Sequence, residues 1–352
     1  MNVKITGSGS YIPTLTVSNK DFAKHVFLND DGKQLPYSNE VIAYKFRQIT
    51  GIEERRYVED NQQSSDIAFL AAERAIEDAG IDKETIDYII FAHNFGDVKK
   101  GAIQSDILPS LASRVKHNLK IKNPKCVAYD ILFGCPGWVE GVIQAQAYIK
   151  SGMAKRCLVI GAETLSRVVD PHDRDSMIYS DGAGATIVEG TEEDGGILAH
   201  ESASFTYDEA YYLFFGNSYN TGHDPDVRYI KMYGRKIYEF ALTNVPMAMK
   251  ECLDKSGFDI EDVKKILIHQ ANEKMDEAIV ERFFKLYDHE ADNHVMPMSI
   301  GKLGNSSVAT IPTLYDLMIK GKLENQQLNK GDIVIFASVG AGMNINAFVY
   351  KI

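Results

Sequence analysis

The chain has 352 residues, of which 45% are hydrophobic and 25% are charged, with 27 glycines and 10 prolines. This composition excludes a disordered, collagen-like or coiled-coil protein, and the length favours two domains or one fold built from two halves. The 38 Lys and Arg residues against 49 Asp and Glu residues give a net charge of -11, which argues against a general nucleic-acid binder.

Cysteine usage and hydrophobicity indicate the compartment. The four cysteines have neither CxxC spacing nor the density of a disulfide scaffold, and the first residues show no apolar signal core. No apolar run approaches the length needed to cross a bilayer. We therefore expect a soluble, cytoplasmic protein with reduced thiols and no contact with membranes or nucleic acid.

The first half of the chain alternates helix and strand patterns. A helical pattern from Ala71 closes at Gly80, an N-cap follows at Asp82, and residues 88–92 form an apolar strand. Another strand ends near Leu132, at the start of a second helical segment. Two further buried strands are predicted, one of them directly after a Gly-Ala-Gly turn.

The second half repeats this order of elements, which is the signature of an internal duplication. Gly80 matches Gly257, and Ile89 matches Ile266. The matched segments, in chain order, are residues 71–93 with 247–270, residues 135–152 with 305–321, Cys157–Ala162 with Ile333–Ser338, and Gly182-Ala183-Gly184 with Gly340-Ala341-Gly342.

The strands are continuous apolar runs, which is typical of sheets covered by helices on both faces. We predict an α/β protein made of two duplicated halves, residues 1–190 and residues 191–352, joined at the acidic, glycine-rich segment 189–196. Residues 28–40 and 204–232 read as irregular excursions. These either shape a substrate pocket or simply cover the core.

Three residues with useful chemistry stand at comparable turns. Gly134 permits a sharp turn and Pro136 suits the first position of a helix, so Cys135 lies at a helix N-terminus, where the thiolate is favoured. His269 ends a strand, at the sheet edge where ligands bind. Asn305 begins the helix that repeats the Cys135 helix.

Each of these residues also has an ordinary structural explanation. A lone cysteine is more often a small buried hydrophobe, which fits Cys157 inside its strand. His269 could be a capped or surface histidine, and Asn305 could be a simple N-cap. The duplication favours function, because it directs both helix starts, those of Cys135 and Asn305, to one central region.

Together, a thiolate, a histidine and an asparagine can perform acyl transfer and then carbanion chemistry. The thiolate of Cys135 accepts an acyl group from a thioester, while His269 and Asn305 donate hydrogen bonds to the thioester oxygen of a second substrate and stabilise the enolate left by decarboxylation. A papain-type hydrolase also uses Cys, His and Asn, but its CG-[SA]-C-[WY] context is absent.

The chain resembles the β-ketoacyl-acyl-carrier-protein synthase III branch of the thiolase superfamily over nearly its whole length. The matching motifs are ITGSGSYIP (5–13), TGIEERR (50–56), AYDILFGCPGW (128–138), DPHDR (170–174), SDGAGATIV (180–188), IHQAN (268–272), GNSSVATIP (304–312) and VGAGMN (339–344). The sequence is also similar to divergent synthases of secondary metabolism, such as those that make dialkylresorcinols.

This resemblance implies a thiolase-like, fivefold-layered α/β/α/β/α fold, a homodimer, and the catalytic set Cys135, His269 and Asn305. It implies an oxyanion hole made by the backbone N-H groups of Cys135 and Ala341. Substrates are carried on coenzyme A or on the phosphopantetheine of an acyl carrier protein, with no metal and no further cofactor. The implied substrate-binding residues are Leu108, which each subunit lends to its neighbour's pocket, Arg174 for the coenzyme A nucleotide, Lys274 for the acidic carrier protein, and Asn272.

Two positions distinguish this chain within the family. An apolar residue at Leu108 is unlike the glutamate of head-to-head condensing enzymes, which favours a decarboxylating extender. Priming enzymes place a tryptophan shortly before the TGI motif to stack on adenine, whereas this chain has Val-Ile-Ala-Tyr-Lys-Phe-Arg there and its only Trp is Trp138. This difference favours a carrier-protein-bound or unusual acyl donor.

The predicted function is decarboxylative Claisen condensation of an acyl group on Cys135 with a malonyl- or β-ketoacyl-type thioester, in fatty-acid or polyketide-like lipid biosynthesis. An alternative is acyl transfer or non-decarboxylative condensation through the same acylated cysteine. A third hypothesis is a non-catalytic, acyl-binding partner subunit, but such a subunit would not need the thiol.

Overall fold

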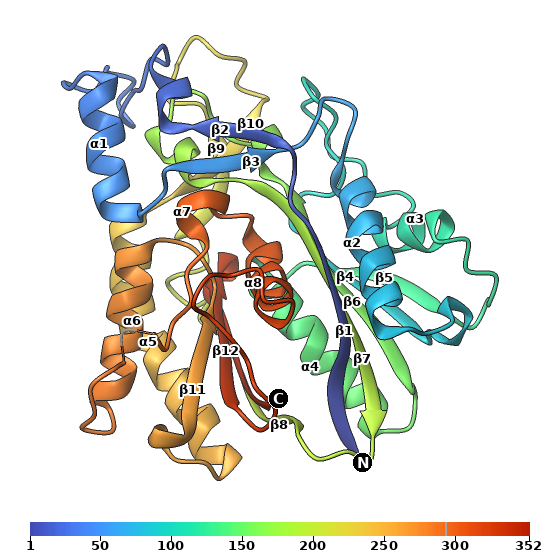
Figure 1. Ribbon diagram of the computed structural model, residues 1–352. Coiled ribbons are helices and arrows are strands. Elements are labelled where there is room, and N and C mark those ends of the chain that lie inside the picture. The colour runs from blue at the N-terminus through green and yellow to red at the C-terminus, as the bar shows by residue number, and fades with distance from the viewer. Residues whose placement is uncertain (293) are drawn as a thin grey trace.

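The computed structural model describes residues 1–292 and 294–352, and two β-sheets organise this part of the chain (Figure 1). The first sheet has the strand order β1-β7-β6-β4-β5, in which β4 runs parallel to β5 and β6 while β1 and β7 pair antiparallel. Its strands are β1 (Asn2–Tyr11), β4 (Tyr88–Ala92), β5 (Val127–Ile131), β6 (Arg156–Thr164) and β7 (Asp181–Thr191).

The second sheet has the order β11-β12-β13-β8, with β11 and β12 parallel and the other pairs antiparallel. Its strands are β8 (Gly196–Ser204), β11 (Val263–Ile268), β12 (Ile333–Gly340) and β13 (Asn344–Lys351). Two small antiparallel pairs lie at one end of the molecule: β2 (Leu15–Ser18) with β3 (Glu54–Tyr57), and β9 (Leu213–Asn217) with β10 (Arg228–Met232).

Helices cover the sheets and fill the space between them. The α-helices are α1 (Asn39–Thr50), α2 (Ser64–Ala79), α3 (Leu111–Asn118), α4 (Gly137–Lys150), α5 (Gly234–Ser256), α6 (Glu273–Lys285), α7 (Ile300–Leu303) and α8 (Thr310–Ile319). The short 3-10 turns are η1 (Asn19–Phe22), η2 (Lys83–Thr85), η3 (Leu165–Arg167), η4 (Arg174–Ile178), η5 (Ile260–Asp262), η6 (Ser307–Ala309) and η7 (Ala341–Met343).

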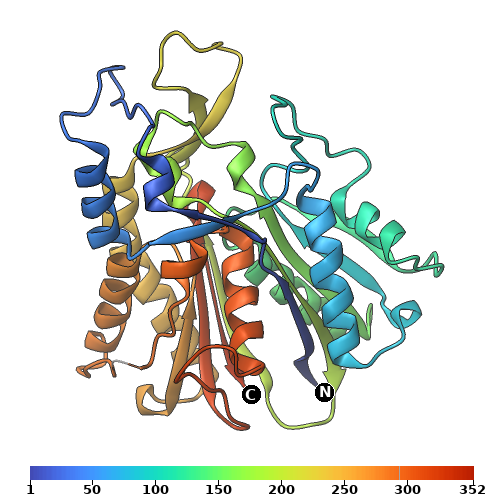
Figure 2. The same ribbon diagram turned by 45° about the horizontal axis from the view of Figure 1, so that its top comes forward.

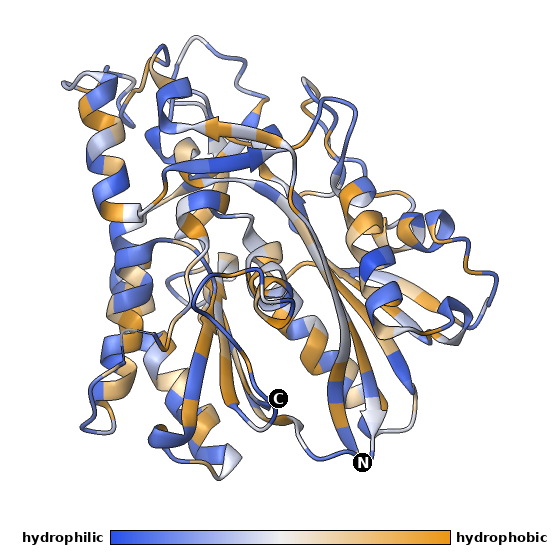
Figure 3. Ribbon diagram, in the orientation of Figure 1, coloured by the Kyte–Doolittle hydropathy of each residue, from blue (hydrophilic) through white to orange (hydrophobic). Residues whose placement is uncertain are grey.

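The layers follow the order α/β/α/β/α, as predicted. Helices α2 and α3 pack on the outer face of the first sheet, α4 and α8 contact both sheets, and α5 and α6 cover the second sheet (Figures 1 and 2). Hydrophobic residues are concentrated in the strands and in the two central helices (Figure 3). Trp138 of α4 is 1% exposed and packs between the sheets against Phe336 and Phe348 of the second sheet, which ties the halves into one core.

The duplicated pattern predicts most element positions. Gly80 ends α2 and Gly257 ends α5, both in the left-handed conformation, and β4 spans the predicted residues 88–92. Part of the pattern differs: Gly182 and Gly184 lie inside β7 and not before it. The reason is close packing, since a Cβ on Gly184 would lie 2.7 Å from Pro312 of α8.

The excursion at residues 204–232 also differs from its prediction as irregular chain. It contains the β9–β10 hairpin, whose two strands carry too few consecutive apolar residues to stand out in the sequence. Among residues 1–292 and 294–352, we find no helix with the length and apolar character that crossing a bilayer requires.

Candidate active site

Close backbone packing at two glycines, Gly134 and Gly340, fixes the position of Cys135. The chain leaves β5, turns at Gly134 with φ +65°, and enters α4 through Pro136. A Cβ on Gly134 would lie 2.6 Å from the backbone nitrogen of Ala341, and a Cβ on Gly340 would lie 2.4 Å from the backbone nitrogen of Cys135. The cysteine turn and the turn after β12 therefore touch through their backbones, which side chains at these positions would prevent.

His269 follows β11, and hydrogen bonds hold both its backbone and its side chain. Its backbone N-H donates to the Ala337 carbonyl of β12 (2.9 Å), and its Nδ1 lies 2.7 Å from the Thr310 hydroxyl of α8. The residue is 3% exposed, and burial lowers the pKa of His269 to about 3. The imidazole is therefore neutral at physiological pH.

The Thr310 hydroxyl can serve either neutral tautomer of His269. It has one proton, and it lies within hydrogen-bond distance of both His269 Nδ1 and the Ser307 carbonyl (3.0 Å). When Thr310 donates to Ser307, His269 carries its proton on Nδ1 and Nε2 is a proton acceptor. When Thr310 donates to His269, Nε2 carries the proton and becomes a donor. The Thr310 contact thus permits His269 Nε2 to act either as a proton acceptor or as a hydrogen-bond donor.

Asn305 is held by its backbone and by one end of its amide. Its N-H donates to the Ile178 carbonyl (3.0 Å), and its carbonyl accepts from the Ser180 N-H (2.9 Å). Its Oδ1 accepts from the Ser307 N-H (2.8 Å), so the amide NH2 is the group that Asn305 offers to the neighbouring cavity. The simple N-cap explanation does not describe it, since Ser306 stands at the start of the short turn η6.

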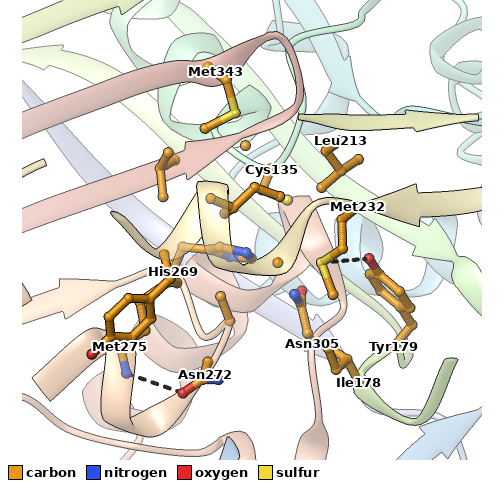
Figure 4. A pocket seen from close by; sticks show the side chains of 16 residues that line it. Cys135, Ile178, Tyr179, Leu213, Met232, His269, Asn272, Met275, Asn305 and Met343 are labelled. Atoms are coloured by element: carbon orange, nitrogen blue, oxygen red, sulfur yellow. Dashed lines mark hydrogen bonds between the residues drawn. The ribbon is translucent and has the colours of Figure 1, made fainter. Parts of the chain in front are cut away.

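Cys135, His269 and Asn305 line one cavity of about 130 Å³ (Figure 4). The close view shows the three side chains converging on the same space. The other lining residues are predominantly apolar: Ile178, Tyr179, Leu213, Met232, Gly234, Ile237, Tyr238, Ala271, Asn272, Met275, Val339, Gly340 and Met343. The site therefore combines a few polar groups with walls suited to a hydrocarbon chain.

Burial controls the charge of the thiol. It raises the pKa of Cys135 to about 11, a hydrogen bond from Ser307 (3.3 Å) lowers this pKa, and the nearby Glu163 carboxylate raises it. The expectation that the helix N-terminus would favour the resting thiolate is therefore wrong for this structure, because desolvation of the charged form outweighs the favourable contacts.

The further predicted residues divide into two groups. Ala341 opens η7 beside Gly134, and Asn272 lines the cavity while its Oδ1 caps α6 by accepting from the Met275 N-H (3.1 Å). Leu108, Arg174 and Lys274 do not line the cavity in the described part of the chain.

These three residues lie on the surface. The side chain of Leu108 is 88% exposed, Lys274 is exposed on α6, and Arg174 forms an ion pair with Asp175 at 3.2 Å. The structure therefore brings together the three proposed catalytic residues, Ala341 and Asn272, and leaves the remaining three away from them.

Several cavity and site residues were not identified from sequence. Ser307 lies within the GNSSVATIP motif, two positions after Asn305, so the motif contained a signal for it. Leu213 and Met232 come from the β9–β10 hairpin, so the segment 204–232 contributes to the pocket, which is one of the two interpretations of its sequence. No local pattern identifies these two side chains. In residues 1–292 and 294–352, no group of three or more His, Cys, Asp or Glu side chains is arranged to hold a metal ion.

Comparisons with known proteins agree on one family. Its model, described as 3-oxoacyl-[acyl-carrier-protein (ACP)] synthase III, matches residues 129–204, and the model of the C-terminal part matches residues 253–352. The β-ketoacyl-[acyl-carrier-protein] synthase III of Staphylococcus haemolyticus is 32% identical over 352 residues, which cover 100% of this chain and 99% of the relative. Synthase III 1 of Vibrio vulnificus is 32% identical over 343 residues, with 97% of each chain covered.

A solved structure gives the same result. The 3-oxoacyl-[acyl-carrier-protein] synthase III from Aquifex aeolicus matches with a TM-score of 0.81 and 30% identity, over 99% of this chain and 100% of that chain. The fold is therefore that of the thiolase-type condensing enzymes. More narrowly, the chain belongs to the β-ketoacyl-[acyl-carrier-protein] synthase III family, and it is an acyltransferase that performs condensation in fatty-acid biosynthesis.

Proposed function

We propose that Cys135 accepts an acyl group from an acyl thioester and that His269 and Asn305 then activate a malonyl- or β-ketoacyl-type thioester for decarboxylative Claisen condensation. The observation that carries this proposal is the shared apolar cavity, since a thiol, an imidazole and a carboxamide from three separate elements line it together. This arrangement supplies the nucleophile and the enolate-stabilising donors required by the reaction.

In the acylation step, the sulfur of Cys135 attacks the thioester carbonyl. The thiol is neutral, so its proton passes to Nε2 of neutral His269 as the carbon–sulfur bond forms, and the departing thiol of the donor takes that proton. The two turns that carry the backbone N-H groups of Cys135 and Ala341 pack closely together. We assign to these two N-H groups the stabilisation of the negative charge that develops on the carbonyl oxygen.

In the condensation step, His269 and Asn305 donate hydrogen bonds to the carbonyl oxygen of the second thioester. The bond to its carboxylate breaks, carbon dioxide leaves, and the electron pair remains as the enolate that these two donors stabilise. The enolate carbon attacks the acyl group, the new carbon–carbon bond forms, and the bond from that carbonyl to the sulfur of Cys135 breaks. Cys135 leaves as a thiolate and takes up one proton from solvent, which is the proton that the overall reaction consumes. His269 serves as donor in the tautomer that accepts from Thr310.

The substrates reach the cysteine on coenzyme A or on the phosphopantetheine arm of an acyl carrier protein, so no further cofactor is required. The exposed cations Lys274 and Arg174 support contact with such anionic carriers. We assign the protein to the cytoplasm, where its free cysteines stay reduced.

We further propose a homodimer. The exposed Leu108 and the edge strand β5 of the first sheet are features that a second copy would cover. Leu108 would then complete the acyl pocket of the neighbouring subunit, and residues 1–190 and 191–352 would act as the two halves of each subunit.

Intact-mass spectrometry tests the acylation step. Wild-type protein incubated with acyl-coenzyme A or acyl carrier protein should gain the mass of one acyl group, and Cys135→Ala should gain none. The absence of a gain on wild type, or an equal gain on the variant, contradicts the proposal. Release of carbon dioxide from a malonyl thioester separates decarboxylative condensation from acyl transfer to another acceptor or non-decarboxylative condensation.

A further inference from the structure

A line of hydrogen-bonded side chains runs from Cys135 away from the cavity. The Ser307 hydroxyl donates to Cys135 Sγ (3.3 Å), and Asn94 Nδ2 donates to Ser307 Oγ (3.1 Å). The backbone N-H and the Nδ2 of Asn94 both donate to Glu163 Oε1, at 2.6 and 2.7 Å. None of these three side chains acts in the steps proposed above.

The available protons determine which group donates and which accepts in each of these hydrogen bonds. Glu163 can only accept from Asn94, which fixes the orientation of the Asn94 amide. One N-H of its NH2 group donates to Glu163 and the other donates to Ser307. The Ser307 oxygen is thereby an acceptor for Asn94, and its single proton points at the sulfur of Cys135. A hydroxyl donor aimed at sulfur stabilises the thiolate more than the thiol.

The backbone of Ser307 is also held by hydrogen bonds and has an unusual conformation. Its N-H donates to Asn305 Oδ1 (2.8 Å), and its carbonyl accepts from Thr310 (3.0 Å). It adopts φ +53°, which is uncommon for a residue other than glycine. Ser307 is therefore held by Asn305 itself and by Thr310, the residue whose hydroxyl also contacts His269.

The line of hydrogen bonds ends, on the side away from Cys135, at the buried carboxyl group of Glu163. Glu163 is 1% exposed, burial raises its pKa to about 7, and its Oε2 is buried without a hydrogen-bond partner in residues 1–292 and 294–352. The titratable groups around Cys135 and Glu163 are His93, Tyr179, Asp181 and His269.

We propose that Ser307 is a positioning residue that sets the reactivity of the Cys135 thiol, and that Asn94, anchored by Glu163, acts through Ser307 by turning its proton toward the sulfur. The role of Cys135 as the acyl acceptor rests on the function proposed above. The hydrogen-bond line itself concerns only how readily this thiol loses its proton.

Alkylation by iodoacetamide, followed by mass spectrometry of the Cys135 peptide across a range of pH, measures that property without any thioester. The loss of a hydrogen bond to a charged group should raise the apparent pKa of Cys135 in Ser307→Ala by about 1–2 units, so alkylation at pH 8 slows about 10- to 100-fold. The neighbouring Ser306→Ala, which removes a hydroxyl without a contact to the sulfur, is the matched control and should keep the wild-type profile.

A double-mutant cycle tests the indirect role of Asn94. Asn94→Ala should slow alkylation, and Asn94→Ala combined with Ser307→Ala should be no slower than Ser307→Ala alone. An unshifted pH profile in Ser307→Ala, or effects of the two substitutions that simply add, overturns the proposal. If thermal unfolding shows that Ser307→Ala does not fold, Asn94→Ala decides alone, and an unchanged rate there is equally decisive.

The outcome is separable from that of the proposed function. A shifted alkylation profile in a protein that no acyl thioester acylates would overturn the function and leave the positioning role of Ser307 standing. Normal acylation together with an unshifted alkylation profile would overturn the positioning role of Ser307 and leave the proposed function standing.

Discussion

Cys135 and His269 are both neutral at rest because burial opposes either charge. Burial raises the pKa of the thiol to about 11 and lowers the pKa of the imidazole to about 3. A resting ion pair of the papain type is therefore disfavoured, and the proton must move while the acyl group is transferred. The Thr310 hydroxyl allows this movement because it can accept from or donate to His269.

The neutrality of His269 can be measured directly. Because its pKa lies near 3, its imidazole should show no protonation step between pH 5 and pH 8, whereas an ordinary histidine titrates near 6.5. NMR of ring-labelled protein makes this measurement, with the His269 signal assigned by its loss in His269→Ala. A full protonation step near pH 6.5 for that signal would show that the site is open to water and charged.

Asn305 should separate the two steps of the reaction. Asn305→Ala removes one donor to the enolate oxygen and should slow condensation about 10²- to 10³-fold. Acylation of Cys135 should fall much less, because Asn305 affects that step only through its hydrogen bond with the Ser307 N-H. Acyl-enzyme formation and product formation are followed in parallel by mass spectrometry. Condensation at full rate, or an equal loss in both steps, would contradict the role given to Asn305.

At the residue scale, sequence predicts the groups that stand at recognisable turns and motifs. The duplication directs Cys135 and Asn305 to one region, and His269 stands at a strand end, where the carboxyl edge of the sheet is expected. Glu163 and Asn94 could not be found in this way. Their connection to Ser307 depends on contacts among β6, the loop after β4 and η6, which no local pattern encodes.

At the element scale, a buried charge cluster fixes the hairpin that forms part of the cavity wall. Lys231 of β10 is 3% exposed, and its Nζ lies 2.7 Å from Asp170 and 2.9 Å from Asp173. Burial alone would raise the pKa of Asp170, but the hydrogen bond from Lys231 is among the contacts that lower it overall. This cluster ties the β9–β10 hairpin, with Leu213 and Met232, to the segment before η4.

Replacing the central cation should therefore be costly. Lys231→Met leaves two carboxylates buried without their partner, and we expect the free energy of unfolding to fall by about 3–5 kcal/mol. The exposed pair Arg235–Glu239 provides the control, since Arg235→Met should change it by at most about 1 kcal/mol. Denaturant unfolding compares the variants, and equal stabilities for the two would mean that the cluster does not hold the hairpin.

The two touching turns make a second prediction at this scale. In Gly340→Ala, the new Cβ would lie 2.4 Å from the backbone nitrogen of Cys135, so the turns must separate and acylation should be strongly reduced. Gly222→Ala is the matched control, because its Cβ would meet only the Asn220 side chain at 3.3 Å. Wild-type acylation by Gly340→Ala, measured by intact mass, would refute the proposed oxyanion geometry.

The elements themselves were predictable where apolar periodicity is strong. Strands β4, β6 and β12 follow buried runs, and the helices before Gly80 and Gly257 end at those glycines. The β9–β10 hairpin was not predicted, because its stability comes from the Lys231 cluster and from packing on the cavity, which are tertiary contacts.

At the scale of the whole molecule, duplication explains why the site lies between the halves. Cys135 comes from the part of the chain that forms the first sheet, whereas His269 follows a strand of the second sheet and Asn305 precedes the central helix α8. The central helices α4 and α8 contact both sheets, so they bring the ends of both halves to one cavity. The repeat in the sequence predicts the convergence of Cys135 and Asn305, and the strand end before His269 predicts its place at the same edge.

The homodimer is a prediction at the same scale. We expect light scattering to give twice the chain mass of 39.3 kDa, and we expect Leu108→Arg to weaken association by placing a charge in the covered surface. Because Leu108 is 88% exposed in the single chain, the substitution should leave unfolding of the subunit nearly unchanged. A stable wild-type monomer at micromolar concentration would contradict this assembly.

The most direct test of the account follows one acyl group through both steps. Wild-type protein is first acylated, freed of excess donor, and then mixed with a malonyl thioester while intact mass and product are recorded together. We predict that the added mass on Cys135 disappears at the rate at which carbon dioxide and the elongated β-keto product appear. An acyl group that remains on the cysteine, or is released as the free acid, would show that Cys135 is not the nucleophile of a condensing reaction.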